Sequence, residues 1–304
     1  MSELHHHLED YLRLRRSLGY KLEFPGLVLP SLVTYLETAG ASAITAELAV
    51  AWAGLPRGVL PITWAHRLGA ARGFARYLKA IDPATEIPPA GIWSPVSPRP
   101  RPWIWAETDI RRLLSAARSL RPPLRAATYE TLFGLLAAAG MRLGEAIKLE
   151  RADADLAEGV LTIRDGKFGV SRLVPLHLGV TTALREYAAC RDRLLPQPAT
   201  TKFFISTAGT PLRTSGVDRA FAQLTTALGL RTRDRHPRIH DLRHSFAVRQ
   251  LLRWHREGAD VRARMPVLSA YLGHISPAGT YWYLEAVPEL MELAAARLAP
   301  GGPR

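Results

Sequence analysis

Residues 240–244 read His240-Asp241-Leu242-Arg243-His244 and open an apolar-periodic stretch that predicts a helix over 241–257. The spacing of three places His240 and Arg243 on one face, near the helix N-terminus. That end of a helix favours anions, and an arginine can contact two oxygens of one phosphate. Taken alone, the pattern is also typical of a solvated basic helix end.

His236, His240 and His244 repeat every four residues, a spacing that also occurs in zinc sites. Pro237 disturbs the helical register of the first histidine, and no glutamate stands where the zinc-protease pattern requires one. The sequence therefore predicts no metal site here. Four arginines around this stretch strengthen its positive field and are predicted to contact DNA: Arg231, Arg233, Arg235 and Arg238.

A second informative segment surrounds Arg142. The apolar stretch 124–139 predicts a long buried helix that ends at Gly140, and a new helix is expected over 141–149. Arg142 would lie on its first turn, where Glu145 on the same face could orient it. An isolated arginine in this position is more often an ordinary surface side chain.

The helical pattern is interrupted between residues 159 and 176. Two β-rich stretches, 160–163 and 173–176, flank Asp165-Gly166-Lys167 and therefore predict a hairpin with Lys167 in its turn. A lysine in a hairpin is ordinarily solvated, so its Gly-Lys setting between two strands is what makes it a candidate.

Further along, Leu272-Gly273-His274 precedes a segment that contains Tyr281 and Tyr283. A tyrosine hydroxyl can attack a phosphate without a metal ion if fixed positive charges and hydrogen-bond donors stabilise the transition state. A packing role is the ordinary interpretation of any one histidine or tyrosine. The order and spacing of all these segments together favour a catalytic interpretation.

That order resembles the tyrosine recombinase or phage integrase family. The shared features are an arginine after a Gly-Met break, Gly-Lys in a hairpin, His-x-x-Arg-His, Leu-Gly-His, and a tyrosine nine residues after the last histidine. The resemblance covers residues 104–290 by motif. It implies that Arg142 and Arg243 bind the non-bridging phosphate oxygens and that His274 donates a hydrogen bond to the phosphate.

The resemblance also implies roles for the remaining candidates. Lys167 would protonate the departing 5′ oxygen, His240 would assist proton transfer, and Tyr283 would form a 3′-phosphotyrosyl bond. Glu145 and His244 would contact and orient these catalytic groups. No metal ion, no cofactor and no ATP are implied, because the phosphotyrosyl bond preserves the energy of the phosphodiester.

Charge and composition agree with a DNA substrate. The chain has 304 residues and a formal net charge of +13, of which residues 1–100 carry +2 and residues 101–304 carry +11. A polyanion is therefore expected mainly on the C-terminal part. The single cysteine, Cys190, excludes an internal disulfide and suits a reducing compartment.

The domain boundary is predicted in a proline-rich linker over 87–103, since proline breaks helices and strand ladders. Upstream, four helical stretches predict a helical domain over 1–86, which the resemblance identifies as a core-binding (SAM-like) DNA-binding domain. Residues 104–304 form the expected catalytic integrase domain. The predicted fold class is mainly α with a small β-sheet (α+β). The linker prolines are Pro88, Pro89, Pro95, Pro98, Pro100 and Pro102.

The expected activity is site-specific recombination of double-stranded DNA, and the ending Thr-Tyr-Trp-Tyr-Leu-Glu-Ala over 280–286 is similar to recombinases of transposon-like elements. The resemblance implies two domains that clamp the duplex and a homo-tetramer on two synapsed duplexes. It also implies a monomer or weak oligomer without DNA, and other recombinases as further partners. A helix over 288–298 is a candidate arm for a neighbouring protomer, with packing against its own domain as the alternative.

Two other functions fit part of the pattern. A catalytically silent DNA-binding regulator would have little reason to keep six catalytic residues. A type IB topoisomerase shares the chemistry but works as a monomer. The longest apolar stretch, 132–141, is shorter than the roughly 20 residues of a membrane span, and the N-terminus lacks a signal-peptide pattern. A cytoplasmic, nucleoid-associated location without a membrane partner is expected.

Overall fold

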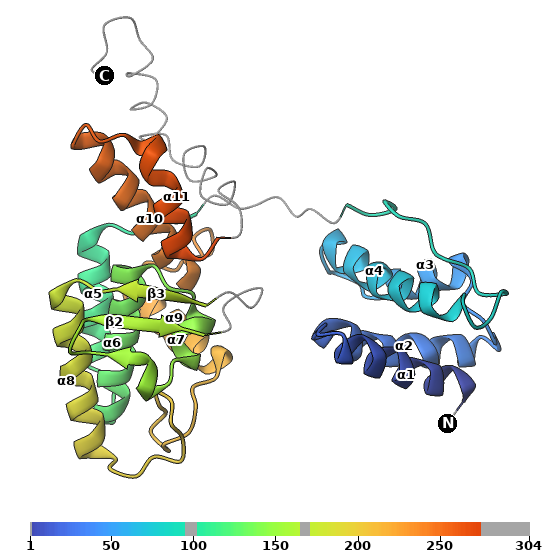
Figure 1. The fold of residues 1–304 in the computed structure, drawn as a ribbon, viewed down its shortest axis with the longest axis horizontal. Helices are drawn as coiled ribbons and strands as arrows, with labels where there is room; N and C mark the ends of the chain where they lie inside the picture. The colour runs from blue at the N-terminus through green and yellow to red at the C-terminus, as the bar shows by residue number, and fades with distance from the viewer. Residues whose placement is uncertain (1, 95–101, 165–170, 275–304) are drawn as a thin grey trace, which may run out of the picture. The chain divides into compact units, whose positions relative to one another are not determined.

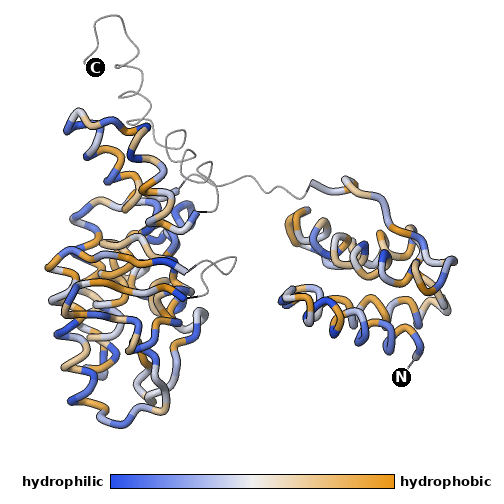
Figure 2. Tube along the Cα trace, viewed as in Figure 1, coloured by the Kyte–Doolittle hydropathy of each residue, from blue (hydrophilic) through white to orange (hydrophobic). Residues whose placement is uncertain are grey.

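The computed structural model describes residues 2–94, 102–164 and 171–274. The chain divides into two compact units, Met1–Pro100 and Arg101–Arg304, and the division falls within the proline-rich segment. Along the helices of both units, hydrophobic and hydrophilic residues alternate every few positions (Figure 2). This is the pattern expected when one face of each helix is buried.

The first unit is a bundle of four helices around one core. Tyr11, Leu32, Trp52 and Phe74, one from each helix, are buried in that core. The Trp52 indole N–H donates to Ser31 Oγ over 3.2 Å, which satisfies its only polar atom. The helices are α1 (Glu3–Ser17), α2 (Glu23–Thr38), α3 (Ala46–Gly54) and α4 (Pro61–Leu78).

The second unit is mainly helical with one small sheet, so the predicted fold class is confirmed. Its largest core lies around α6 and joins the sheet to the helices on either side of it in sequence. The elements are α5 (Glu107–Arg118), α6 (Pro123–Ala139), α7 (Leu143–Lys148), the 3-10 helix η1 (Arg151–Asp153), β1 (Ala154–Asp155), β2 (Val160–Ile163), β3 (Arg172–Pro175), α8 (Leu178–Leu194), α9 (Thr214–Ala227), α10 (Ile239–Arg256) and α11 (Val261–Leu272).

The sheet is antiparallel with strand order β1-β2-β3. In its register Leu161 pairs with Val174, and Ile163 pairs with Arg172. Side chains alternate across a sheet, so these four residues share one face. Leu161, Ile163 and Val174 are buried on that face, and Arg172 therefore points toward the protein interior.

The two last described helices form a small core of their own. Val248 and Leu251 of α10 pack with Met265 and Leu268 of α11, and all four are buried. Figure 1 shows these helices side by side, with α11 reaching β3. This packing brings the end of α11 next to the start of β3.

Several boundaries differ from the sequence-based expectation. Helix α7 begins at Leu143, whereas the helix was expected from residue 141. Helix α11 was not predicted, because Pro266 lies inside it. The hairpin turn over 165–170 and the expected helix over 288–298 lie outside the described residues. No helix in the described part of the chain is long and apolar enough to cross a membrane.

Candidate active site

Arg142 is the N-cap residue of α7 and lies just after the end of α6. Helix α6 ends at Gly140, whose φ of 60° is left-handed, and a Cβ at this position would lie 2.4 Å from the Phe246 ring. Only glycine fits this turn. The new helix consequently begins at Leu143, two residues later than expected, with extended backbone at Arg142.

Glu145 binds Arg142 from within the first turn of α7. Its Oε1 accepts a hydrogen bond from Arg142 Nη1 over 2.7 Å, and its Oε2 accepts one from the Arg142 backbone N–H over 3.1 Å. These contacts form only the glutamate half of a capping box, because an arginine side chain cannot accept from the Glu145 backbone N–H. The structure thus brings together the predicted pair of arginine and supporting glutamate.

A second arginine shares the same carboxylate. Arg172 donates from Nη1 to Glu145 Oε1 over 3.1 Å and from Nη2 to Glu145 Oε2 over 2.8 Å. Burial alone would raise the pKa of the Glu145 carboxyl. Hydrogen bonds and charge from Arg172 and Arg142 outweigh that effect and lower this pKa to about 2.

Arg243 is the most deeply buried of the candidate phosphate ligands, with 1% of its surface exposed. Its Nη1 donates to the Gly140 carbonyl and its Nη2 to the Leu272 carbonyl, each over 2.7 Å. The same Nη2 lies 2.9 Å from His274 Nε2. Arg243 therefore joins the end of α6, the end of α11 and the Leu-Gly-His segment.

Three arginines converge on three consecutive carbonyls at the end of α11. Arg172 Nε donates to Tyr271 O over 2.8 Å, Arg243 to Leu272 O over 2.7 Å, and Arg142 to Gly273 O over 2.7 Å. A helix C-terminus has free carbonyls and a negative dipole end, which both favour cations. The arginines come from β3, α10 and the start of α7.

His274 is neutral in this arrangement. Arginine N–H groups can only donate, so the contact with Arg243 requires His274 Nε2 to accept and assigns its ring proton to Nδ1. Burial lowers the pKa of His274 to about 4, and the nearby charges of Arg243 and Arg142 act in the same direction.

His240 lies at the N-terminus of α10 and faces His244, with ring centroids 4.6 Å apart and ring planes at 89°. The residue is exposed. Partial desolvation of the imidazole, followed by the effects of His244 and Arg243, nevertheless lowers the pKa of His240 to about 4. The ring is accessible and neutral near pH 7.

The predicted DNA-contacting arginines lie in the segment before α10. Arg231 donates to the Pro237 carbonyl over 2.8 Å, and Arg238 donates to Asp241 over 3.1 Å. Arg233 is exposed, and the Arg235 guanidinium lies 5.7 Å from the Trp103 ring centroid. Arg235 is exposed as well.

Two predicted catalytic residues, Lys167 and Tyr283, lie outside the described residues. The described chain ends at Ile163-Arg164 and resumes at Ser171-Arg172 on the two sides of Lys167. Their positions relative to the other candidates therefore stay predictions from the sequence.

Comparison with known proteins identifies the family to which the chain belongs. The phage integrase family matches residues 105–289, which is more than half of the chain. The chain belongs to the phage integrase family. It is therefore an enzyme, a tyrosine-type site-specific recombinase.

Relatives of this integrase include a candidate integrase/recombinase of Sinorhizobium fredii, y4rB, which is 44% identical over 98% of both chains. Tyrosine recombinase XerC of Methylobacterium is 36% identical over 71% of this chain and 64% of its own.

Solved structures share the fold of the integrase. The Tn1549 transposon integrase matches with a TM-score of 0.65 and 16% identity, over 95% of this chain and 99% of that one. A lambda integrase dimer bound to a COC′ core site matches with a TM-score of 0.62 and 19% identity, over 92% and 94%.

Sequence reasoning missed Arg172 as a component of the site. The available signal was strand alternation: Arg172 is two residues before Val174 and therefore shares its inward face. An inward-pointing cation on a strand needs an anionic partner. The carbonyls of residues 271–273 could not be foreseen, because backbone groups at a helix end leave no trace in residue type.

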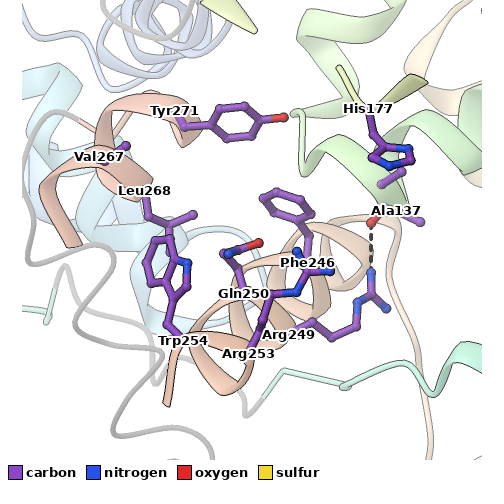
Figure 3. Close-up of a pocket in the computed structure, with 11 residues that line it drawn as sticks. Ala137, His177, Phe246, Arg249, Gln250, Arg253, Trp254, Val267, Leu268 and Tyr271 are labelled. Atoms are coloured by element: carbon purple, nitrogen blue, oxygen red, sulfur yellow. Dashed lines mark hydrogen bonds between the residues drawn. The ribbon is translucent and has the colours of Figure 1, made fainter. Parts of the chain in front are cut away.

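A cavity of about 530 Å³ adjoins the site between α10 and α11. Figure 3 shows Phe246, Trp254 and Tyr271 around it, and a hydrogen bond of 2.9 Å from Arg249 to the Ala137 carbonyl. Among the described residues, none of the candidate catalytic side chains lines this cavity. These candidates instead gather at the N-termini of α7 and α10 and the end of α11, which suits a substrate as large as a DNA duplex.

Proposed function

We propose that this integrase cleaves DNA through attack of Tyr283 on a phosphodiester, forms a 3′-phosphotyrosyl intermediate, and uses neither a metal ion nor ATP. One observation carries the proposal: Arg142, Arg243 and His274 converge at the end of α11. Two guanidinium groups and an imidazole at one point form a site for a phosphate and for the extra negative charge of its transition state.

In the proposed cleavage step, a bond forms between Tyr283 Oη and phosphorus while the bond from phosphorus to the 5′ oxygen breaks. The tyrosine proton passes to His240, and Lys167 gives a proton to the departing 5′ oxygen. Arg142 and Arg243 stabilise charge on the non-bridging oxygens throughout. The low pKa of His240 supports its role as acceptor, because the ring is neutral before DNA binds.

Phosphate binding would also change the histidines. A negative phosphate near His240 and His274 stabilises the imidazolium form and so raises the pKa of both rings from about 4. His240 thereby becomes a better proton acceptor in the complex than in the free enzyme. His274 could then turn a ring N–H toward the phosphate.

Religation is the reverse reaction with a different strand. The free 5′-OH of the partner strand attacks phosphorus, the bond to Tyr283 breaks, and protons return along the same path. The phosphotyrosyl bond has nearly the energy of the original phosphodiester, so strand exchange needs no ATP. The guanidinium groups supply the positive charge for which other enzymes use metal ions.

The proposed substrate is double-stranded DNA, bound as a homo-tetramer on two synapsed duplexes. Two duplexes that exchange both strands require four cleavages, one for each protomer. A lambda integrase tetramer bound to a Holliday junction has the same fold, with a TM-score of 0.63 and 18% identity, which supports this assembly. Without DNA we propose a monomer or weak oligomer.

Both units of the chain would contact DNA. We propose that the helical domain over 1–86 is the core-binding DNA-binding domain and that residues 104–304 form the catalytic domain, joined by the linker over 87–103. The net charge of +11 on residues 101–304 supports placing most phosphate contacts on the second unit.

Covalent trapping tests the proposal and its nucleophile. Nicked duplexes that tile the DNA flanking the coding sequence would be incubated with wild type, Tyr283→Phe and Tyr281→Phe, and adducts would be separated on denaturing gels. We expect an adduct with wild type and Tyr281→Phe and none with Tyr283→Phe, since Tyr283 stands nine residues after His274, the spacing of the family pattern.

Adduct formation by Tyr283→Phe but not by Tyr281→Phe would overturn the nucleophile assignment. Absence of any adduct with wild type, although it binds the duplexes, would favour a silent DNA-binding regulator. Relaxation of plasmids that lack a specific site would favour a topoisomerase.

A further inference from the structure

Arg172 connects three parts of the candidate site through its guanidinium group. Two of its bonds go to the Glu145 carboxylate of α7 and one goes to the Tyr271 carbonyl of α11. The Arg172 side chain is 10% exposed, and Arg172 is the first residue of strand β3. All three of these donors are directed at protein acceptors.

We propose that Arg172 is a positioning residue for strand cleavage, which fixes Glu145 and the 271–273 turn so that Arg142 faces the scissile phosphate. The inference rests on the proposed function, since it assigns a role within the same site. Arg172 acts through Arg142 and touches no reacting atom.

The sharing of Glu145 explains how Arg172 controls Arg142. Each Glu145 oxygen accepts from both arginines: Oε1 from the two Nη1 groups, and Oε2 from Arg172 Nη2 and the Arg142 backbone. Without Arg172, a buried carboxylate would keep only Arg142 as its charged partner. The Arg142 guanidinium would then turn toward Glu145 and away from a phosphate.

Arg172 also fills the space beside Gly273. A Cβ on Gly273 would lie 2.7 Å from Arg172 Nη1 and 2.9 Å from its Cζ, so the guanidinium packs directly on the glycine backbone. Gly273 provides the carbonyl that accepts from Arg142 and precedes His274. Loss of the guanidinium would leave a gap under this turn and loosen both contacts.

Arg191 offers a matched control outside the site. It is 1% exposed, donates to the Phe203 carbonyl over 2.7 Å and pairs with Asp192 over 2.8 Å. Neither partner belongs to the group formed by Glu145 and residues 271–274. Replacement of Arg191 should cost stability in the same way as replacement of Arg172, but it should leave the orientation of Arg142 unchanged.

The test compares cleavage of a phosphate with cleavage of a methylphosphonate. Arg172→Met, Arg142→Ala and Arg191→Met would be assayed with wild type in single turnover on the nicked duplex, with either linkage at the scissile position. A methylphosphonate has no charged non-bridging oxygen, so an arginine that neutralises this charge is no longer needed. DNA affinity and unfolding temperature would be measured for each variant.

We expect Arg172→Met to cleave the phosphate on the order of 10²-fold more slowly than wild type, with nearly unchanged DNA affinity. On the methylphosphonate its rate should approach that of wild type, as should the rate of Arg142→Ala. Arg172→Lys, which keeps the charge but cannot span three acceptors, should recover only part of the rate. Arg191→Met should match wild type on both linkages.

The inference is overturned if Arg172→Met cleaves the phosphate as fast as wild type, or is equally slow on both linkages. The same defect and recovery in Arg191→Met would also overturn it, since any buried arginine would then suffice. If wild type forms no adduct on any duplex, the proposed function itself fails.

Discussion

The two arginines proposed to bind phosphate are positioned by the protein in different ways. Arg243 is 1% exposed and bonds to carbonyls at the ends of two helices, whereas the Arg142 side chain is 20% exposed and depends on one carboxylate and one carbonyl. Arg243 is consequently part of the core of the unit as well as of the site. Arg142 depends more on its neighbours for its orientation.

Lys167 is predicted to be the general acid of strand cleavage. A 5′ alkoxide is a poor leaving group, and proton donation is worth about 10² to 10⁴ in rate. A substrate with a 5′-bridging sulfur, which leaves without a proton, should therefore restore cleavage to Lys167→Ala. It should not restore Arg142→Ala, whose defect concerns the non-bridging oxygens. Equal recovery of both variants, or of neither, would contradict this role.

The lowered pKa of Glu145 predicts how the free energy of unfolding depends on pH. Its folded pKa of about 2 lies below its ordinary value of 4.5, so the ion-pair cluster contributes stability above pH 4.5 and loses it as the pH falls toward 2. The shift corresponds to about 3 kcal/mol. Chemical denaturation at several pH values should show a difference between wild type and Glu145→Gln that shrinks between pH 5 and pH 3. A difference that is constant over this range would contradict the assignment.

At the scale of elements, the end of α11 depends on a glycine for two reasons. Gly273 has a φ of 68°, and a Cβ there would collide with Arg172. Gly258 at the end of α10 has a φ of 70° and nothing within 4 Å, so it provides the matched control. In both Gly273→Ala and Gly258→Ala, backbone strain should lower the free energy of unfolding by about 1 kcal/mol.

Only Gly273→Ala should also lose strand cleavage, because it displaces Arg172 and the carbonyl that accepts from Arg142. Single-turnover rates and unfolding free energies of the two variants would be compared. A similar loss of cleavage in Gly258→Ala would mean that helix-end strain alone disturbs the enzyme.

Elements were predictable from the sequence wherever periodicity was strong. The first unit has the four predicted helices, and the strands β2 and β3 agree with the predicted β-rich stretches to within about one residue. Helix α11 was not predicted because a proline such as Pro266 usually indicates a helix break. Pro266 is exposed, however, and the helix continues past it. Strand β1 has two residues, too few to show alternation.

The candidate site was predictable in its residues but not in its connections. Arg142, Arg243 and His274 follow from motif and spacing, and the structure brings them together. What joins them is tertiary: Arg172 from β3 and three backbone carbonyls. Such contacts depend on how β3 and α11 pack, which no local pattern encodes.

At the scale of the whole molecule, positive charge is concentrated in the second unit, at +11 against +2 for residues 1–100. The exposed Arg233 and Arg235 are predicted to bind the DNA backbone. Replacing both with alanine should weaken binding to all sequences. The slope of log K against log salt should fall by about 1 for each phosphate that the variant no longer neutralises.

Arg151→Ala provides a comparison for this measurement, because Arg151 is paired with Asp192 on the same unit and should leave the slope unchanged. Fluorescence anisotropy over a series of salt concentrations would give the slopes. If the double variant keeps the wild-type slope, Arg233 and Arg235 do not bind phosphates.

The convergence of three arginines on the end of α11 has a consequence for the entropy of DNA binding. A free arginine side chain carries about 2 kcal/mol of rotamer entropy, which a flexible site must lose when substrate docks. Here Arg142, Arg172 and Arg243 are already ordered by the fold before DNA arrives. The site is thus preorganised, and more of the binding free energy remains to stabilise the transition state.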